Sequence, residues 1–188
     1  MDDTEFPLNI EAVRKAVFEI VEASMVCRDG MRSHFLYKSE DDKNLRYYYV
    51  GCEFLYFYLH ILSRQCSKQY GYDTRDTIQA YLGSSISEVM VSMWPENLID
   101  KIRAEFFDHL NGAEEDYSNC TEGISDSDKD LSGNSLASMV SRNVATMCGV
   151  PLNIEARQDA LSLALKALEQ LNIDDLLRKM LNKPDHEI

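Results

Sequence analysis

The sequence predicts an all-α fold, a bundle of six or seven helices around one central, aromatic-rich buried helix. Three observations lead to this prediction. The 188 residues include only 4 prolines and 8 glycines, which is too few for a turn-rich β fold. Apolar residues recur three and four positions apart in successive segments. No two segments alternate apolar and polar residues as paired strands do. A chain of this length can bury a sizeable core, so we expect a single domain over residues 1–188.

The first helix is predicted over Ile10–Cys27. Asn9 is a good N-cap residue, because its side-chain oxygen can accept a hydrogen bond from a free amide of the first turn. Glu11 lies in that first turn, where the helix dipole favours a negative charge. The mixed polar segment 28–43 is predicted to be a loop with a short helix around Ser33–Tyr37.

The central helix is predicted over Asn44–Tyr70. Within residues 47–62 the only strongly polar side chains are those of Glu53 and His60. A helix that is apolar on all sides belongs in the core of a bundle. The aromatic content also leaves a strand open as an alternative for Tyr47–Val50. Sixteen residues fall short of the roughly 20 that a membrane span needs, so we expect no membrane insertion.

Five further helices follow in the prediction. Asp73 or Thr74 caps the third, whose apolar stripe continues unbroken through Gly83. Pro95 suits the start of the fourth, where its missing N–H costs nothing. Asn172 caps the last, short helix. The predicted bounds are about 74–93, Pro95–Leu110 with an extension to Tyr117, Ser135–Cys148, Ile154–Leu171 and Ile173–Leu181.

The hexapeptide PLNIEA occurs twice, at Pro7–Ala12 and at Pro151–Ala156. The residues that follow diverge, and no second shared element accompanies the repeat. Each copy has the features of a helix start, with Asn as the cap and Glu in the first turn. We therefore interpret the repeat as two similar helix entries, not as a duplicated domain.

The charge distribution excludes some partners. The chain carries 32 acidic against 19 basic residues, a net charge of −13. Such a surface repels phosphate backbones and anionic lipids, so we expect neither nucleic-acid nor membrane binding. Seven acids gather in Gly112–Asp130, within a predicted acidic Ser/Gly-rich loop over 112–134. This loop is either a solvated segment or a patch that docks a basic protein partner.

The cysteines and the N-terminus indicate a cytoplasmic protein. Five cysteines at wide spacing, without a CxxC motif, are typical of small buried side chains in a reduced protein. The start MDDTEFPLNI has neither a basic n-region nor an apolar h-region, so we expect no secretory signal.

The order of several segments resembles a family of uncharacterised all-helical bacterial proteins. These are the aromatic helix FLYFYLHILSRQ, then TRDTIQAYLGSSISEVM, then IRAEFFDHLNGAEEDYSNC, and a closing helix ALSLALKALEQLNIDDLL. The resemblance covers about residues 45–181. It implies an all-helical fold and a bacterial origin, and it implies no chemistry.

Glu53, His60, Glu105 and His109 are the candidate metal ligands. The first two are seven residues apart and the last two are four apart, so each pair shares a helix face. A di-iron bundle needs two Glu-x-x-His pairs and two further acids, and neither pair has that spacing. The stretch DSDKDLSGNSLA also fails as a calcium loop, with Leu131 in place of Gly and Ala137 in place of Glu. We therefore predict no metal and no cofactor.

Eight of the ten tyrosines lie within one third of the chain. Tyr47, Tyr48 and Tyr49 cannot all face one core, because consecutive helical residues point about 100° apart. These three are the candidate interface residues, since half-buried aromatics are favoured at subunit contacts. Glu53, Tyr56 and His60 are the candidate lining of a ligand pocket.

No nucleophile–base motif appears, so the sequence favours a non-enzymatic protein. The leading hypothesis is a helical module that acts by protein–protein contact, as a homodimer. Two alternatives remain open. One is an acidic immunity-type protein or inhibitor that blocks a basic site. The other is a helical bundle that binds a small molecule or metal.

Overall fold

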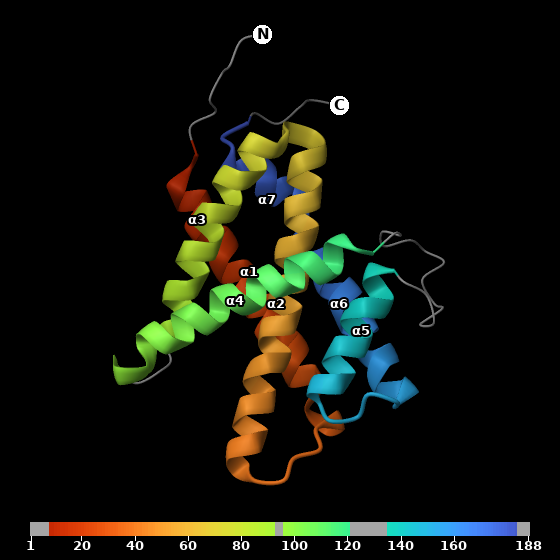
Figure 1. Cartoon of the computed structure of the whole chain (residues 1–188). Helices are drawn as coiled ribbons and strands as arrows, with labels where there is room; N and C mark the ends of the chain where they lie inside the picture. Colours follow the sequence, from red (N-terminus) through yellow and green to blue (C-terminus); the bar gives the residue numbers. More distant parts are fainter. Residues whose placement is uncertain (1–7, 93–95, 121–134, 184–188) are drawn as a thin grey trace.

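The computed structural model describes residues 8–92, 96–120 and 135–183 of the chain. In these ranges it contains seven α-helices, two short 3₁₀ helices and no strand, so the prediction of an all-α bundle is confirmed (Figure 1). The helices are α1 (Ile10–Gly30), α2 (Glu40–Tyr70), α3 (Tyr72–Val91), α4 (Ile99–Ser118), α5 (Leu136–Met147), α6 (Ile154–Leu171) and α7 (Ile173–Met180). The 3₁₀ helices are Arg32–His34 and Glu96–Leu98.

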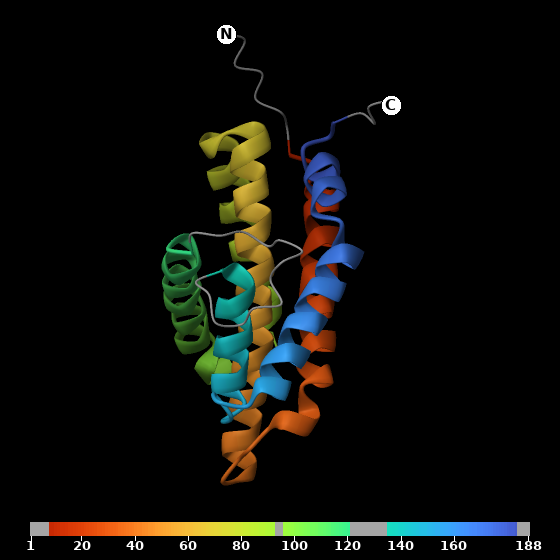
Figure 2. The same ribbon diagram turned by 90° about the vertical axis from the view of Figure 1, so that its right-hand side faces the viewer.

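Helix α2 is the centre of the bundle, as predicted. It contacts α1, α3, α4, α5 and α7, and every residue in Val50–His60 is buried. Figure 2 shows α2 between a layer that holds α1, α6 and α7 and the helices α4 and α5 on its other side. The apolar character of this segment on all sides follows from its place inside the bundle.

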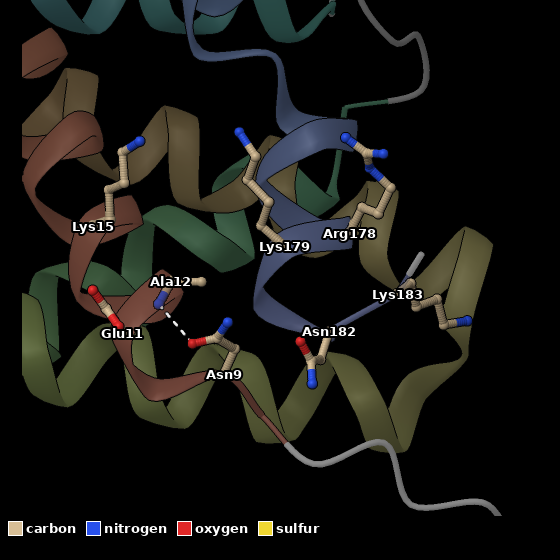
Figure 3. A pocket seen from close by; sticks show the side chains of 8 residues that line it. All are labelled: Asn9, Glu11, Ala12, Lys15, Arg178, Lys179, Asn182 and Lys183. Atoms are coloured by element: carbon tan, nitrogen blue, oxygen red, sulfur yellow. Dashed lines mark hydrogen bonds between the residues drawn. The ribbon is translucent and has the colours of Figure 1, made fainter. Parts of the chain in front are cut away.

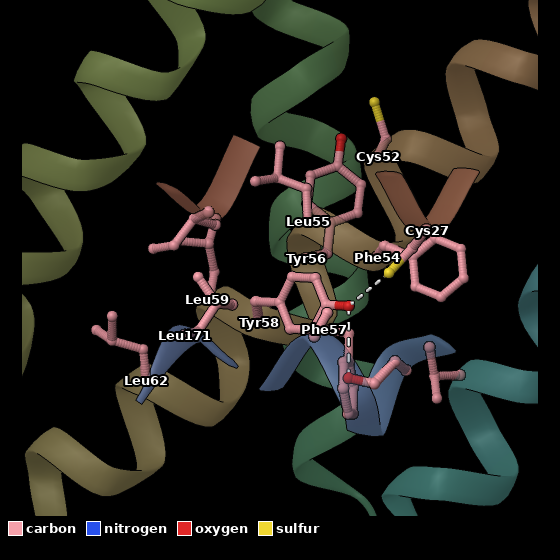
Figure 4. Packing of buried hydrophobic residues seen from close by; sticks show 14 of the residues in the cluster. Cys27, Cys52, Phe54, Leu55, Tyr56, Phe57, Tyr58, Leu59, Leu62 and Leu171 are labelled. Carbon is pink, nitrogen blue, oxygen red and sulfur yellow. Dashed lines mark hydrogen bonds between the residues drawn. The ribbon is translucent and has the colours of Figure 1, made fainter. Parts of the chain in front are cut away.

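Tyr58 ties the central helix to two of its neighbours. Its ring is fully buried, and its hydroxyl lies 3.2 Å from Sγ of Cys27 on α1 (Figure 4). The same hydroxyl is 3.5 Å from the backbone oxygen of Ala164 on α6. A buried tyrosine needs such a partner, because its hydroxyl is otherwise removed from water without compensation.

The structure moves the start of the central helix from the predicted Asn44 to Glu40. Oγ of Ser39 accepts a hydrogen bond from the backbone N–H of Asp42 at 3.1 Å. Oδ2 of Asp42 in turn accepts one from the backbone N–H of Lys38 at 2.9 Å. Ser39 is therefore an N-cap that was missed, followed by three acids that suit the first turn of a helix. The strand alternative for Tyr47–Val50 is wrong, since these residues are helical.

Two further boundaries differ from the prediction. Helix α3 begins at Tyr72, directly after Gly71 at φ 85°, and has no side-chain cap, so Asp73 and Thr74 are not its caps. Helix α4 begins at Ile99, after a 3₁₀ turn, and not at Pro95. It then continues to Ser118, in line with the predicted extension to Tyr117, so the first seven residues of the predicted loop 112–134 are helical.

Both PLNIEA copies are helix starts, as predicted. Asn9 accepts a hydrogen bond from the N–H of Ala12 at 3.1 Å, and Asn153 accepts one from the N–H of Ala156 at 3.0 Å. Their surroundings differ. Leu8 packs against the core, whereas Leu152 is 91% exposed. The shared sequence sets the local hydrogen bond, and the rest of the fold decides what becomes buried.

Candidate functional site

One face of α2 lines a pocket of about 380 Å³ that lies between α2, α4 and α5. Tyr49, Cys52, Glu53 and Tyr56 contribute from α2 at positions i, i+3, i+4 and i+7, which share one helix face. The structure thus places two of the three candidate pocket residues, Glu53 and Tyr56, on the pocket wall.

Helices α4 and α5 supply the other walls. From α5 come Asn143 and Met147, one turn apart. Helix α4 contributes a stripe with the spacing i, i+1, i+4, i+5 and i+8, namely Asp108, His109, Gly112, Ala113 and Asp116. The pocket therefore has an apolar and aromatic lining with several carboxylates. None of its described lining residues is a lysine or an arginine.

Glu53 is the buried polar group of this pocket, with only 4% of its surface exposed. Its Oε1 accepts two hydrogen bonds, from the Tyr117 hydroxyl at 2.5 Å and from the Asn143 side-chain amide at 2.8 Å. In the part of the chain that the structure describes, no group donates a hydrogen bond to the other oxygen, Oε2. A carboxylate can accept about four hydrogen bonds, so half of this one is left without a protein donor.

Burial raises the pKa of the Glu53 carboxyl above its ordinary value, because removal from water disfavours the charged form. The hydrogen bonds from Tyr117 and Asn143 act against this rise in pKa. Asp116 raises the pKa of Glu53 further by like-charge repulsion, and His109 lowers it. The carboxylate would therefore gain from a cation placed at Oε2.

His60, the third candidate pocket residue, does not line this pocket. Its Nδ1–H donates a hydrogen bond to Oε2 of Glu114 at 2.7 Å. The Tyr117 ring lies against His60, with 5.4 Å between ring centroids, while its hydroxyl reaches Glu53. Tyr117 therefore separates His60 from Glu53, although both lie on the same face of α2.

The four candidate metal ligands do not converge. His60 pairs with Glu114, His109 lies on the pocket wall, and Glu105 pairs with Lys101 on its own helix. A search of the described residues finds no group of three or more His, Cys, Asp or Glu side chains that could hold a metal ion.

The cysteines are buried and free, as the sequence predicts for small core side chains. Cys52 is the one that reaches the pocket wall, and burial raises the pKa of its thiol to about 12. A thiol that stays protonated at neutral pH is a poor nucleophile. Cys52 is therefore better suited to packing than to covalent catalysis.

The three interface candidates all contact other parts of the same chain. Tyr47 packs on Phe35, lies under the Arg28 guanidinium at 4.4 Å, and donates a hydrogen bond to Asp29 at 2.7 Å. Tyr48 packs against the core, and Tyr49 lies on the pocket wall with its ring 5.7 Å from that of His109. All three rings are half-buried.

Sequence reasoning missed Tyr117, Asn143, Asp108 and Asp116 as parts of this site. Tyr117 and Asn143 are 64 and 90 residues from Glu53, so no local pattern links them to it. The spacing of Asp108 and Asp116 on one helix was the available signal, since residues eight apart share a face. This signal was partly hidden because residues 112–117 were predicted both as an extension of the fourth helix and as the start of the loop 112–134.

A second pocket, of about 490 Å³, lies where the start of α1 meets the end of α7. Figure 3 shows Lys15 and Lys179 on opposite sides of it, with Lys183 pointing away from Lys15. Asp175 pairs with Lys179 and Arg178, and Lys183 lies 4.3 Å from the Tyr70 ring centre. These basic side chains are thus engaged within the chain, which makes this pocket a weaker candidate than the one at Glu53.

Residues 121–134, most of the predicted acidic loop, lie outside the described residues. The hypothesis of a basic protein partner for this loop therefore stays a prediction.

None of the helices in residues 8–92, 96–120 and 135–183 combines the length and apolarity needed to cross a membrane. Comparison of the chain with protein-family models, with curated proteins and with solved structures gave no match. The resemblance to uncharacterised bacterial helical proteins therefore stays a prediction, and the pocket at Glu53 is the feature from which a function can be argued.

Proposed function

We propose that this protein binds a small organic cation, such as an amine, in the pocket lined by Glu53. This is the small-molecule alternative that the sequence leaves open. The observation that carries it is a buried carboxylate with one oxygen hydrogen-bonded to Tyr117 and Asn143 and the other without a described protein donor.

The energetics favour a cation over a neutral or anionic ligand. A buried carboxylate loses its hydration, and a charge in the protein interior is stabilised only when it is paired or fully hydrogen-bonded. No described lysine or arginine lines the pocket, and His109, the wall residue that can carry a positive charge, acts on Glu53 without a described hydrogen bond to Oε2. An ammonium group at Oε2 would donate hydrogen bonds and supply the opposite charge.

The aromatic wall supports the same class of ligand. Tyr49 and Tyr56 lie on the pocket wall from the same helix as Glu53. Cations are attracted to the negative faces of such rings, an effect that strengthens when the site is screened from water. The methylene groups of an amine would pack on Met147 and Ala113.

Isothermal titration calorimetry with n-butylamine, choline and butyrate tests the proposal, in about 0.15 M salt so that diffuse attraction to the acidic surface is screened. We expect the two cations to bind and butyrate not to bind. Glu53→Gln keeps an oxygen for Tyr117 and Asn143 and replaces the charged Oε2 by an amide. It should weaken cation binding about 30-fold, since a charged hydrogen bond contributes roughly 2 kcal/mol.

Glu115→Gln is the matched control, because Glu115 is exposed on α4 and does not line the pocket. It removes the same charge and should leave the affinity unchanged. Equal binding to Glu53→Gln and to the unchanged protein would overturn the proposal, as would the absence of binding by either cation at millimolar concentration.

A second candidate function, self-association, has its own support. Leu36, Leu152 and Ile154 are 61%, 91% and 65% exposed. The backbone N–H of Leu36 donates a hydrogen bond to the oxygen of Cys148 at 2.9 Å, which places the segment before α2 beside the turn that leads to α6. Exposed large apolar side chains that gather in one region are typical of contact surfaces.

Light scattering after size exclusion tests this second candidate. A dimer gives a mass of twice 21.6 kDa. Leu152→Ser should shift the protein toward the monomer, whereas Phe18→Ser, which removes an exposed ring from α1, should not. A monomer across the micromolar range would contradict self-association.

A further inference from the structure

Three carboxylates, not one, lie on the walls of the Glu53 pocket. Glu53 is buried at α2, whereas Asp108 and Asp116 are exposed residues of α4. Eight helical residues separate the two aspartates, which corresponds to about 12 Å along the helix axis. The negative charge is thus spread along the pocket and is not gathered at one point.

The space between the two aspartates is open. Gly112 lies midway between them on the same stripe of α4, and a Cβ added there would meet no atom within 4 Å. Gly in a helix interior lowers the stability of the helix by about 1 kcal/mol relative to Ala, so helix stability does not explain a glycine at this position. An extended chain could lie against the backbone of α4 at Gly112, with a carboxylate on each side.

From these observations we propose that the cation bound here is a linear polyamine, with one ammonium group at Glu53 and others near Asp108 and Asp116. This rests on the proposed function and narrows its ligand class. A polyamine carries several ammonium groups separated by methylene segments, which matches separated carboxylates with apolar and aromatic residues between them. A compact metal ion does not match, because no described cluster gathers three ligands at one point.

The side chains around the pocket fit this ligand. Asp116 lies close enough to Glu53 to act on its charge, so the two can share one end of the ligand. Tyr49 and Tyr56 line the pocket, and aromatic rings attract ammonium groups and pack against methylene groups. The remaining titratable ring on the wall, that of His109, packs against Tyr49.

The experiment is a calorimetric series with n-butylamine, 1,4-diaminobutane and spermidine on the full chain. Each added ammonium group should tighten binding about two- to fivefold, the range of a solvent-exposed ion pair. Asp108→Asn with Asp116→Asn should remove this gain in affinity, while n-butylamine should still bind through Glu53. Asp100→Asn with Glu115→Gln, two exposed acids of α4 outside the pocket, should keep the gain and controls for total charge.

A second pair of variants tests the open space without a change of charge. Gly112→Leu should fill the groove and abolish the advantage of spermidine, while helix propensity keeps α4 folded. Asn111→Leu, at an exposed neighbouring position outside the pocket, should have no effect on binding.

Equal affinities for n-butylamine and spermidine would overturn the polyamine inference. So would an Asp108/Asp116 variant that still binds spermidine more tightly than n-butylamine. Neither result would contradict the proposed function if n-butylamine still binds through Glu53. Loss of all amine binding would overturn both.

Discussion

Glu53 and His60 lie two turns apart on the same face of α2, and 4% and 2% of their surfaces are exposed, yet their surroundings differ. Glu53 adjoins an open pocket and has one oxygen without a described protein donor. His60 is enclosed, and its partner Glu114 keeps a 29% exposed side chain.

The difference shows that burial of a polar side chain does not by itself identify a binding site. Both residues are rare polar positions in an apolar helix, so the sequence pattern alone does not distinguish them. Glu53 combines an oxygen that has no described protein donor with an adjacent pocket into which a ligand can bring a partner. Nε2 of His60 is buried and has no hydrogen-bond partner in the described residues, but His60 does not line the pocket at Glu53.

The largest change in the free energy of unfolding is expected from a substitution of Tyr117, the residue that separates Glu53 from His60. Tyr117→Phe keeps the ring beside His60 and removes the hydroxyl that donates to Glu53. The loss of a hydrogen bond to a buried carboxylate should lower the free energy of unfolding by about 2 kcal/mol, measured by urea denaturation.

Tyr81→Phe serves as the control for that measurement, because Tyr81 is 48% exposed on α3. It should leave the free energy of unfolding within about 0.5 kcal/mol of the original value. A similarly small change in Tyr117→Phe would show that Glu53 does not depend on this hydroxyl.

A smaller, pH-dependent effect is expected from Glu53 itself. Burial raises the pKa of its carboxyl in the folded state above the ordinary 4.5, so the folded state holds this proton more tightly than the unfolded state. The contribution of Glu53 to stability is thus present at low pH and lost as pH rises from about 4.5 through the folded-state pKa. Each pH unit in that window is worth about 1.4 kcal/mol.

Glu53→Gln cannot lose a proton, so its stability relative to the original protein should rise across the same pH window. Urea denaturation of both proteins at a series of pH values measures the difference, which cancels the titration of all other groups. A difference that stays flat with pH would mean that the carboxyl of Glu53 titrates as it does in the unfolded chain.

The smallest effect is expected from His60→Leu. The substitution removes a buried Nε2 that has no described partner and leaves Glu114 partly open to water. The gain and the loss should nearly cancel, with a change in the free energy of unfolding below about 1 kcal/mol. A loss of more than about 2 kcal/mol would show that the free energy of unfolding depends on the hydrogen bond of His60, as is expected for that of Glu53.

Much of the fold could be predicted from the sequence because its signals are local. Asn153 and Asn172 specify the starts of α6 and α7, and the predicted bounds Ile154–Leu171 are those observed. The unbroken stripe through Gly83 correctly indicated one helix. Ser39 was missed because a charged first turn resembles a polar loop until its capping bonds are seen.

Only part of the candidate site could be predicted from the sequence. Glu53 and Tyr56 stand out within their own helix, so the sequence could nominate them. The spacing of His60 from Glu53 suggested a shared pocket, but spacing on one helix says nothing about the helix that covers it. Tyr117 arrives from α4 and fills the space between them, and that depends on how two helices cross.

The length and central position of α2 have a consequence for local unfolding. The helix is 31 residues, or about 46 Å, long, and its middle is enclosed by neighbours while its first residues are exposed. Amide hydrogen exchange along it should be graded, with rapid exchange near Glu40 and the slowest in Val50–His60. Cys52, Glu53 and Tyr56 on the pocket wall therefore belong to the part of the helix that opens last, so a ligand bound there would meet a surface of α2 that is already ordered.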